Sequence, residues 1–383
     1  MRFLVLGTGL QGSAAAFDLL RTSDAAVTLA DAAPERLSDL LTPYRGRRLS
    51  VMKVDARDER NLRDVMRGHD AILCALPYYL NFDMARLAVD LGIHFADLGG
   101  NTEIVRRQET LDEQARGKGV SVVPDCGLAP GMVNILAGEG MRRLERTDSV
   151  RLYVGGLPQH PEPPLNYTVV YSLEGVLDYY TTPSWIVRGG VPMTVNALSE
   201  TETVSFPAPV GELEAFHTAG GISTMPWRFA GCVESMEYKT LRYPGHAAIM
   251  RALRDLGLLS TVPVDVKGTS VAPRDAFIAV VSPKLRKPNV PDLVALRVVV
   301  TGTKKGKPHI VAFRLLDYYD AELGVSAMMR TTGYSLSITA VMQVHGTVAP
   351  GAKPAYDVIP YGPYVDELRK RGIAIEEDGP SGT

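Results

Sequence analysis

The feature that most constrains the fold of this chain is a glycine-rich turn close to its first residue. An apolar run at residues 3–6 predicts a buried strand, and Gly7, Gly9 and Gly12 follow with the spacing G-x-G-x-x-G before a helical pattern begins at Ser13. Glycine permits a tight turn and a close approach of the backbone to a pyrophosphate, which the N–H groups at the start of the helix can bind. The turn therefore predicts a dinucleotide site; the alternative is a tight turn that binds nothing.

An acidic residue bears on which dinucleotide binds. A second apolar run, residues 26–30, ends at Asp31. A carboxylate at this place accepts hydrogen bonds from the adenosine ribose and repels a 2′-phosphate, and the nearest basic residue that follows is Arg36. We therefore expect NAD rather than NADP, the alternative being that Asp31 only caps the next turn. The other residues expected to bind the cofactor are Leu10, Gln11, Asp55, Ala75, Leu76, Pro77 and Gly127.

Strand and helix patterns alternate over the first 125 residues. Apolar runs predict strands at residues 3–6, 26–30, 50–53, 71–75, 94–97 and 120–123. Helical patterns lie between them, at residues 13–21, 34–41, 59–66, 81–91 and 110–115. This repetition predicts a parallel sheet covered on both faces, so we expect an α/β fold in which residues 1–126 form a doubly wound Rossmann domain.

The pattern changes after residue 126. Longer strand-like runs lie at residues 150–154, 200–206, 264–267, 294–301 and 309–316, and helical patterns at 132–143, 173–179 and 247–258. The last two runs flank TKKGK, which predicts a hairpin turn. We expect residues 127–326 to form an α+β catalytic and dimerisation domain with a mainly antiparallel sheet, one face of which a partner subunit can cover.

The last part of the chain contains a long apolar helical pattern at about residues 330–344. We expect residues 327–383 to pack back on the first domain. A short helix at 364–371 and a strand at 373–375 are predicted to follow, with a disordered tail at 379–383.

Size, charge and cysteine usage exclude several classes of protein. The 383 residues are too many for one ordinary core, and a net charge of −2 without a long basic run argues against nucleic acid and membrane partners. No apolar stretch reaches transmembrane length and no signal-peptide pattern is present, so we expect a cytoplasmic protein. Cys74, Cys126 and Cys232 lie far apart, and the seven histidines are scattered. We therefore expect neither a disulfide nor a metal site.

Acidic residues follow several strands of the predicted parallel sheet, where ligands of such sheets bind. Asp55 could reach the adenine amino group or cap the helix that follows. Asp97 and Asp125 end strands near the expected position of the nicotinamide, and each is either a catalytic carboxylate or a helix cap. Cys126 is interpreted as a buried, inert thiol. Gly127 opens the turn-forming sequence GLAPG, whose N–H groups could face the nicotinamide amide or a substrate carboxylate.

Several motifs together resemble those of the saccharopine dehydrogenase-like superfamily. They are GTGLQG, KVDA, CALPYYLN, FADLGGN, PDCGLAPGMVNIL, YVGGLPQHPEPPLNY, EAFHTAGG and KTLRYPGH, and they extend over nearly the whole chain. Within the superfamily, the L-lysine 6-dehydrogenases are the most similar group. The resemblance implies an NAD-binding Rossmann domain, a catalytic domain with dimer contacts, and oxidative deamination of an amino acid side chain. We accordingly expect an amino acid substrate and a homodimer or a higher homo-oligomer.

The implied chemistry directs attention to basic residues of the second domain. An ammonium must lose a proton before hydride can leave its carbon, which calls for a general base. His217 and His246 could move that proton; the alternative is turn capping or hydrogen bonding in the core. A substrate α-carboxylate calls for arginine, and we expect Arg242 to bind it unless it is a strand arginine paired across the sheet. Tyrosines cluster nearby, where core or interface packing is favoured over a substrate wall: Tyr167, Tyr171, Tyr179 and Tyr180.

These features lead to one expected reaction and two alternatives. We expect NAD-dependent oxidation of the ε-amine of L-lysine to 2-aminoadipate 6-semialdehyde, by hydride transfer followed by imine hydrolysis. A reductive condensation dehydrogenase of the saccharopine or carboxynorspermidine type is the nearest alternative, and a non-catalytic NAD sensor is the second. Basic residues are sparse in residues 151–260 outside one helical pattern, which favours a substrate with fewer carboxylates.

Overall fold

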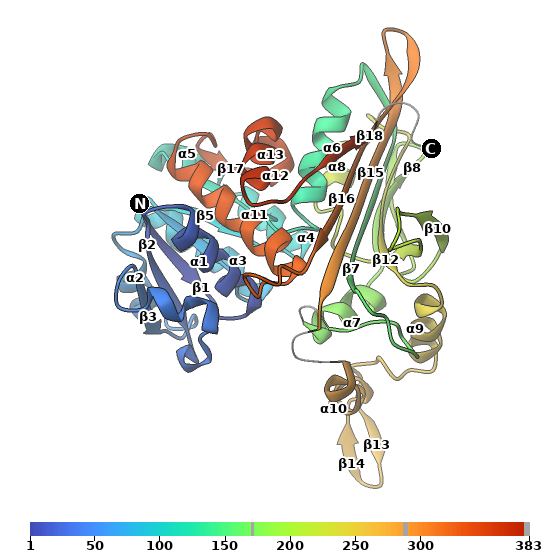
Figure 1. Cartoon of the computed structure of the whole chain (residues 1–383), viewed down its shortest axis with the longest axis horizontal. Coiled ribbons are helices and arrows are strands. Elements are labelled where there is room, and N and C mark those ends of the chain that lie inside the picture. Colours follow the sequence, from blue (N-terminus) through green and yellow to red (C-terminus); the bar gives the residue numbers. More distant parts are fainter. Residues whose placement is uncertain (170–171, 286–289, 379–383) are drawn as a thin grey trace. The chain divides into compact units, whose positions relative to one another are not determined.

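The computed structural model describes residues 1–169, 172–285 and 290–378, which divide into two compact units (Figure 1). The first unit comprises Met1–Arg143, Ser223–Met225 and Asp320–Glu377. The second comprises Leu144–Ile222 and Pro226–Tyr319, together with Asp378. The first unit thus continues past residue 126, where the sequence places the boundary, and it includes the segment that follows residue 320.

A parallel sheet forms the centre of the first unit, as predicted. Its strands are β1 (Arg2–Leu6), β2 (Ala26–Asp31), β3 (Leu49–Lys53), β4 (Ala71–Cys74), β5 (His94–Asp97), β6 (Ser121–Val123) and β17 (Gly351–Ala352). They lie in the order β17-β6-β5-β4-β1-β2-β3, and every pair is parallel. The chain moves to opposite sides of β1 at β2 and at β4. The carboxyl end of β1 is therefore the switch point at which such sheets bind ligands.

Helices surround this sheet. They are α1 (Leu10–Thr22), α2 (Glu59–Met66), α3 (Asn81–Leu91), α4 (Thr102–Glu109), α5 (Asp112–Lys118), α6 (Met132–Arg142), α11 (Ala327–Val344), α12 (Ala355–Val358) and α13 (Tyr361–Lys370). Helix α4 was not predicted, because its sequence TEIVRRQE is mostly charged, and Asn101 caps it by accepting from two backbone N–H groups. The helix predicted at residues 34–41 is wrong. Two short 3₁₀ helices, Pro34–Arg36 and Asp39–Tyr44, occupy this region, and Pro43 lies inside the second.

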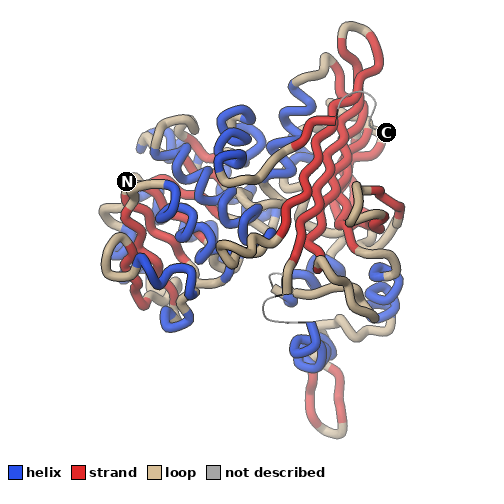
Figure 2. The backbone as a smooth tube through the Cα atoms, viewed as in Figure 1, coloured by secondary structure: helices blue, strands red, loops and turns tan. Residues whose placement is uncertain are grey.

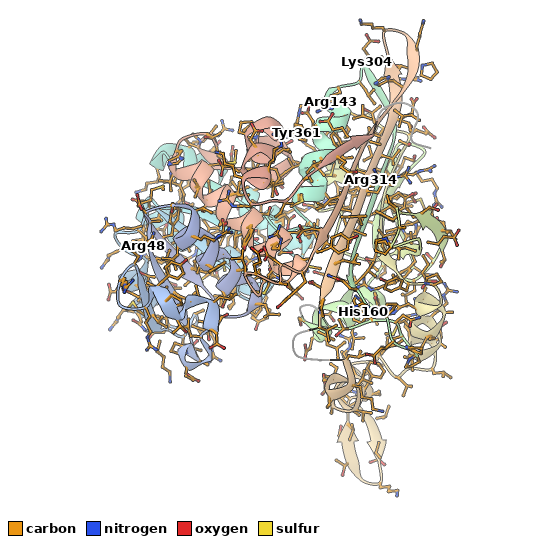
Figure 3. The ribbon with its side chains drawn as sticks, in the orientation of Figure 1. Arg48, Arg143, His160, Lys304, Arg314 and Tyr361 are labelled. Atoms are coloured by element: carbon orange, nitrogen blue, oxygen red, sulfur yellow. The ribbon has the colours of Figure 1, made fainter. Side chains whose placement is uncertain are left out.

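The segment after residue 320 packs against the beginning of the chain. Small residues let α11 approach α1: a Cβ on Gly333 would lie 2.5 Å from the Cβ of Ala14. Arg371 donates to the buried carboxylate of Asp18, with its Nε 2.8 Å from Oδ1. Arg143, labelled in Figure 3, lies 5.1 Å from the centre of the Tyr361 ring. The C-terminal segment therefore completes the core of the first unit.

A mixed, mainly antiparallel sheet forms the second unit (Figure 2). Its strands are β7 (Arg146–Pro158), β8 (Ser184–Arg188), β9 (Val191–Val195), β10 (Glu202–Ser205), β11 (Glu212–His217), β12 (Ser235–Arg242), β15 (Asp292–Lys304) and β16 (Lys307–Tyr318). Six of them follow the order β10-β11-β12-β7-β15-β16, in which only β12 and β7 are parallel, while β8 pairs with β12 and β9. The predicted hairpin at TKKGK joins β15 to β16 through Lys305 and Gly306, both with positive φ.

Several outcomes in the second unit and near the C-terminus differ from the sequence prediction. The strand predicted at 264–267 lies outside the large sheet: among the described strands, β13 (Val264–Val266) pairs only with β14 (Thr269–Val271). Helices α7 (Leu173–Thr181) and α9 (His246–Asp255) were predicted, whereas α8 (Met225–Arg228) and α10 (Pro273–Leu285) were not. The final strand, β18, is Glu376–Asp378 rather than 373–375, and the tail at 379–383 lies outside the described residues. None of the described helices combines the length and apolar character that a membrane span requires.

Candidate functional site

The glycine turn of the first unit has the geometry of a phosphate cradle. Gly7 has a φ of +103°, and a Cβ on it would lie 2.8 Å from the carbonyl oxygen of Ala75. A Cβ on Gly12 would lie only 2.0 Å from the carbonyl oxygen of Gly7. A Cβ on Gly9 would meet nothing within 4 Å. The turn is therefore closely packed at Gly7 and Gly12 and open at Gly9. Each glycine of the motif thus has a distinct steric role.

Unsatisfied polar groups lie where this turn enters helix α1. The first N–H groups of a helix lack an intrahelical partner, and Gly9, the N-cap of α1, has no side chain that could accept from them. The side-chain amide of Gln11 is shielded from solvent, and neither its nitrogen nor its oxygen has a hydrogen-bond partner among the described residues. Leu10 between them is 53% exposed. A bound diphosphate would satisfy such groups, so the residues present fit a dinucleotide.

A pocket of about 330 Å³ lies at the ends of β2 and β4. Asp31, Asp55, Leu76 and Pro77 line it, so the structure brings together four of the residues predicted to bind the cofactor. The carboxylate of Asp31 accepts from the backbone nitrogens of Thr8 and Ala33, at 2.8 Å each. Asp31 therefore caps the two turns at the pocket, as its alternative role predicts, and it lines the pocket, where ribose binding stays a prediction.

Asp55 is engaged by a neighbouring arginine rather than by a helix. Its carboxylate accepts from Nε and Nη2 of Arg57, at 3.0 and 2.8 Å, and from the Arg57 backbone nitrogen at 3.0 Å. The Arg57 side chain holds the pKa of Asp55 at about 2. The predicted alternative of a helix cap is wrong, because Asp58 caps α2. Asp55 and Arg57 thus form an ion pair on the pocket wall.

Two buried carboxylates lie together at the ends of β5 and β6. Asp97 accepts from the Gly99 nitrogen at 2.7 Å, from Gln108 Nε2 at 2.6 Å and, more weakly, from the Asp125 nitrogen at 3.4 Å. Burial raises the pKa of Asp97 to about 6 and that of Asp125 to about 8. Neither residue caps a helix, since the caps of α4 and α6 are Asn101 and Gly131. The helix-cap alternative is therefore wrong for both.

The two oxygens of Asp125 have different surroundings. Oδ2 accepts a short hydrogen bond from the hydroxyl of Ser223, a residue that sequence reasoning missed. Oδ1 is buried without a hydrogen-bond partner among the described residues. It lies against the backbone of Gly99, where a Cβ would come within 1.6 Å of it. A protonatable carboxyl with one unpaired oxygen is a group that can exchange a proton with a ligand.

The turn after Asp125 is tight, and a helix follows it as predicted. A Cβ on Gly131 would lie 2.0 Å from the carbonyl oxygen of Gly127, so the turn closes on itself and α6 begins directly after it. The Gly131 nitrogen donates to Asn134 Oδ1 at 2.7 Å. Cys126 is fully buried and its thiol donates to the Val123 carbonyl, which agrees with its interpretation as an inert thiol.

In the second unit, Arg242 and His246 meet through one tyrosine. Arg242 Nε donates to the hydroxyl oxygen of Tyr180 at 3.1 Å, and His246 Nε2 lies 3.0 Å from the same oxygen. The guanidinium also lies 4.7 Å from the centre of the Tyr167 ring. Burial lowers the pKa of His246 to about 3, so the ring is neutral at pH 7. A carboxylate ligand of Arg242 would have to reach a residue that is 4% exposed. The cavity beside His246, Tyr167 and Tyr180 is only about 10 Å³.

His217 lies apart from Arg242 and His246. In the register of β11 and β12, His217 is opposite Lys239 and Glu214 is opposite Arg242. Side chains three residues apart on a strand point to opposite faces, so His217 and Arg242 lie on opposite faces of the sheet. The structure therefore does not combine these two predicted residues. Tyr167 and Tyr180 belong to a core cluster, as favoured from the sequence, whereas Tyr171 lies outside the described residues.

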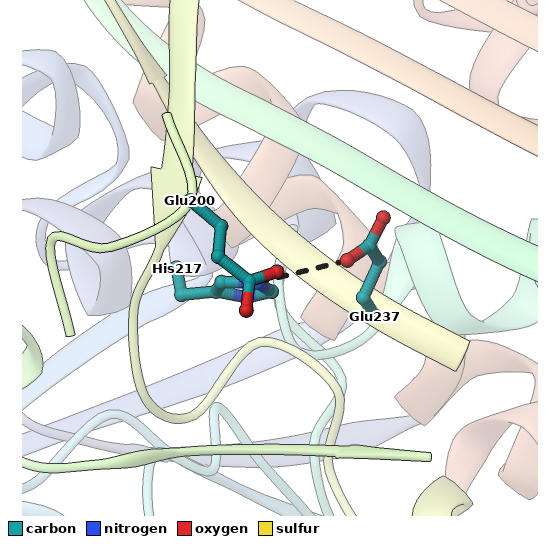
Figure 4. A group of neighbouring side chains, drawn as sticks. All are labelled: Glu200, His217 and Glu237. Atoms are coloured by element: carbon teal, nitrogen blue, oxygen red, sulfur yellow. Dashed lines mark hydrogen bonds and ion pairs between the residues drawn. The ribbon is translucent and has the colours of Figure 1, made fainter. Parts of the chain in front are cut away.

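His217 forms a polar cluster with Glu200 and Glu237 (Figure 4). Its Nε2 lies 3.3 Å from one Glu200 oxygen and 3.6 Å from one Glu237 oxygen, a spacing that could hold a metal ion. Cationic side chains already oppose these carboxylates: Arg188 is 2.8 Å from Glu200, and Lys239 is 4.0 Å from Glu237. Burial lowers the pKa of His217. The balance of charge favours an ion-pair network around a neutral histidine over a metal centre.

The sheet order, the glycine cradle and the adjoining pocket define a Rossmann-type dinucleotide-binding protein. Residues 3–123 match the saccharopine dehydrogenase NADP binding domain, and residues 127–373 match the saccharopine dehydrogenase C-terminal domain. The chain belongs to the saccharopine dehydrogenase family, which confirms the resemblance seen in its motifs.

Relatives of known name agree with this assignment. Mouse mitochondrial alpha-aminoadipic semialdehyde synthase is 25% identical over 270 residues, covering 68% of this chain but only 28% of the synthase. The saccharopine dehydrogenase [NADP(+), L-glutamate-forming] of Schizosaccharomyces pombe is 21% identical over 403 residues, covering 86% of this chain and 88% of that enzyme.

Solved structures share the fold. The apo saccharopine dehydrogenase (L-Glu forming) of Saccharomyces cerevisiae superposes with a TM-score of 0.79 at 20% identity, covering 98% of this chain and 99% of that one. Homospermidine synthase of Legionella pneumophila, in complex with NAD, gives a TM-score of 0.71 at 11% identity, covering 98% of this chain and 91% of that one. Both likenesses establish the α/β fold with its parallel and mixed sheets.

Proposed function

We propose that this protein is an NAD-dependent L-lysine 6-dehydrogenase, which converts the ε-amine of L-lysine to 2-aminoadipate 6-semialdehyde and ammonia. Family membership supports an oxidoreductase acting on lysine-related compounds. The preference for L-lysine itself rests on the chain's motifs and on the sparse basic residues within residues 151–260, outside the helical pattern that carries Arg251 and Arg254.

The observation that carries the proposal is the environment of Asp125. A lysine ammonium has an ordinary pKa of about 10.4 and cannot release hydride while it is protonated. A carboxyl of ordinary pKa would be a poor acceptor for that proton, whereas burial raises the pKa of Asp125 to about 8. After the proton is removed to Asp125, hydride leaves Cε and a cationic iminium forms. Water then adds to the iminium carbon, and ammonia leaves.

The residues of the first unit would hold the cofactor. Gly7, Gly9 and Gln11 are proposed to bind the diphosphate, and Asp31 the ribose hydroxyls, which favours NAD over NADP. Bound there, NAD would supply the acceptor for the hydride that leaves Cε. Asp31→Ser is expected to weaken NAD binding selectively; equal losses for NAD and NADP, measured by titration calorimetry, would remove Asp31 from this role.

The decisive assay is NADH formation with a panel of L-lysine, L-ornithine, diamines and saccharopine. We expect activity with L-lysine and a loss of about 10²–10⁴-fold in kcat for Asp125→Asn. Asp112→Asn is the matched control, because Asp112 also lies in the first unit but accepts from the Ala352 backbone nitrogen, a hydrogen bond that an amide oxygen can keep. An Asp125→Asn variant as active as the wild type would refute the role of Asp125.

Arg242 is proposed as the ligand of the substrate carboxylate. Arg242→Ala is then expected to raise the KM for L-lysine strongly, while Arg188→Ala, which removes an arginine of the His217 cluster, leaves it unchanged. An unchanged KM would leave Arg242 with a structural role in the aromatic core.

A saccharopine-type dehydrogenase is the second candidate, and the names of the relatives favour it. Oxidation of saccharopine alone, in the same panel, would establish it in place of the lysine reaction. Binding of NAD without hydride transfer to or from any of these amines would instead indicate a sensor.

A homodimer or higher homo-oligomer is also proposed. Valines are exposed on the β13–β14 hairpin and α10, where Val264, Val266 and Val280 are 48%, 49% and 64% accessible. Sedimentation should show an assembly that Val280→Arg weakens and Val191→Arg, at a site 61% accessible on β9, does not. A monomeric wild type would contradict this proposal.

A further inference from the structure

Three consecutive residues belong to the first unit although they interrupt the sequence of the second. They are Ser223, Thr224 and Met225. Ser223 donates to Asp125, the Thr224 hydroxyl lies 2.7 Å from that of Tyr356, and Met225 Sδ accepts from Asn134 Nδ2 at 3.3 Å. Each of the three side chains is therefore fixed by its own contact.

The conformation of Ser223 is unusual. Its φ is +57°, in the left-handed region that non-glycine residues rarely adopt, and the residue is 2% exposed. Backbone strain of this kind persists where the surroundings hold it, and it gathers at functional sites. The contacts of Thr224 and Met225 hold the segment in place, and the hydroxyl of Ser223 meets Oδ2 of Asp125 as a result.

The hydroxyl of Ser223 is the polar side chain that offsets unfavourable charge around Asp125. Asp97 and Glu109 carry like charge and disfavour the carboxylate form, while the Cys126 thiol and the Tyr356 hydroxyl stay neutral. Burial acts in the same direction as the like charges. The hydrogen bond donated by Ser223 opposes them and, to a smaller extent, so does the backbone N–H of Gly100. The bond from Ser223 also fixes which oxygen is engaged, and leaves Oδ1 without a partner among the described residues.

We infer that Ser223 is a positioning residue for Asp125: it holds the carboxyl group by Oδ2, leaves Oδ1 as the oxygen that takes the proton from the substrate amine, and keeps the carboxylate form accessible. This inference rests on the proposed function in so far as Asp125 is the base. The local effect on Asp125 does not depend on the substrate. The two can therefore be tested separately.

The first measurement uses the protein without substrate. Carbon-13 NMR of aspartate-labelled protein, with Asp125→Asn to assign the signal, gives the titration midpoint of Asp125. Ser223→Ala is expected to raise this midpoint by about one pH unit, a tenfold change in proton affinity. Ser223→Gly, which suits the positive φ and removes the same hydroxyl, should give the same shift, while Ser223→Thr should largely restore the wild-type value.

Thr224→Val is the matched control, because it removes a hydroxyl from the neighbouring residue but breaks a bond to Tyr356 instead. It should leave the Asp125 midpoint unchanged. A midpoint unaffected by both Ser223→Ala and Ser223→Gly, or moved equally by Thr224→Val, overturns the inference.

The second measurement is the pH profile of L-lysine oxidation. Loss of the Ser223 hydroxyl should lower kcat with little change in KM and move the ionisation of the base to higher pH, in step with the NMR result. A wild type that oxidises no amine, together with the expected NMR shift, would refute the proposed function and leave the Ser223–Asp125 pairing standing. Amine oxidation whose profile is identical in Ser223→Gly would overturn the positioning role.

Discussion

Replacing Asp125 by asparagine should change how the stability of the first unit depends on pH. Burial raises the pKa of Asp125 to about 8 from 3.8, so the native state binds a proton that the unfolded state releases between these values. The contribution of this carboxyl is therefore fully present below about pH 4 and is lost as the pH rises toward 8. The slope is ~1.4 kcal/mol per pH unit, or about 4 kcal/mol between pH 5 and pH 8.

Asparagine has nearly the same shape and cannot ionise, so this slope disappears in Asp125→Asn. The variant also places an amide against Gly99, which changes the free energy of unfolding by an amount that does not depend on pH. Relative to the wild type, Asp125→Asn should therefore gain about 4 kcal/mol of stability from pH 5 to pH 8. The gain is measured as a difference between the two proteins at each pH, which cancels the titration of all other groups that behave alike.

The chain offers a probe for the first unit alone. Cys74 and Cys126 are buried in it, whereas Cys232 is exposed in the second unit. In a Cys232→Ser background, labelling of the two remaining thiols during urea titration follows unfolding of the first unit. Fluorescence of Trp185 and Trp227 follows the second. A stability difference between wild type and Asp125→Asn that is the same at pH 5 and pH 8 would refute the raised pKa and, with it, the role of Asp125 as a base near neutral pH.

Three further predictions concern packing and charge. Arg371→Leu leaves the carboxylate of Asp18 buried without its cation, and should destabilise the first unit by ~3–5 kcal/mol in urea titrations; a loss below 1 kcal/mol would contradict the importance of this pair. Gly333→Val places a side chain where even a Cβ lies 2.5 Å from the Cβ of Ala14, so the melting temperature should fall by several degrees. Gly117→Val in α5, where a Cβ meets nothing within 4 Å, tests the cost of a helical valine without the clash. Arg57→Ala should return the pKa of Asp55 from about 2 toward 3.8 in an NMR titration, and an unmoved value would show that the ion pair does not form in solution.

Much of the first unit could be predicted because its signals are local. Each strand of the parallel sheet is an apolar run, and the glycine turn needs particular residues at particular positions, as the clash that a Cβ on Gly12 would cause makes plain. Helix α4 was not predicted because its sequence is mostly charged, and its helical structure depends on the Asn101 cap and on packing against neighbouring elements. Local pattern therefore predicts elements that carry their own apolar stripe and misses those that depend on tertiary packing.

The candidate site was only partly predictable for the same reason. Asp125 ends a strand and could be singled out, but its partner Ser223 is distant in sequence and reaches it through a turn that only the folded chain reveals. His217 and Arg242 were grouped because both lie near glycines in one region. Strands β11 and β12 were not predicted, so the alternation that puts these side chains on opposite faces could not be read from the sequence.

The place of residues 320–377 in the first unit has a consequence for synthesis of the protein. When the ribosome has made the six strands β1–β6, the apolar surface that α11 covers is still bare, and Asp18 still lacks Arg371. Translation must pass through the whole second unit before these parts exist. The nascent polypeptide thus carries an incomplete first unit while the second unit is synthesised, so the second unit can fold before the first is complete.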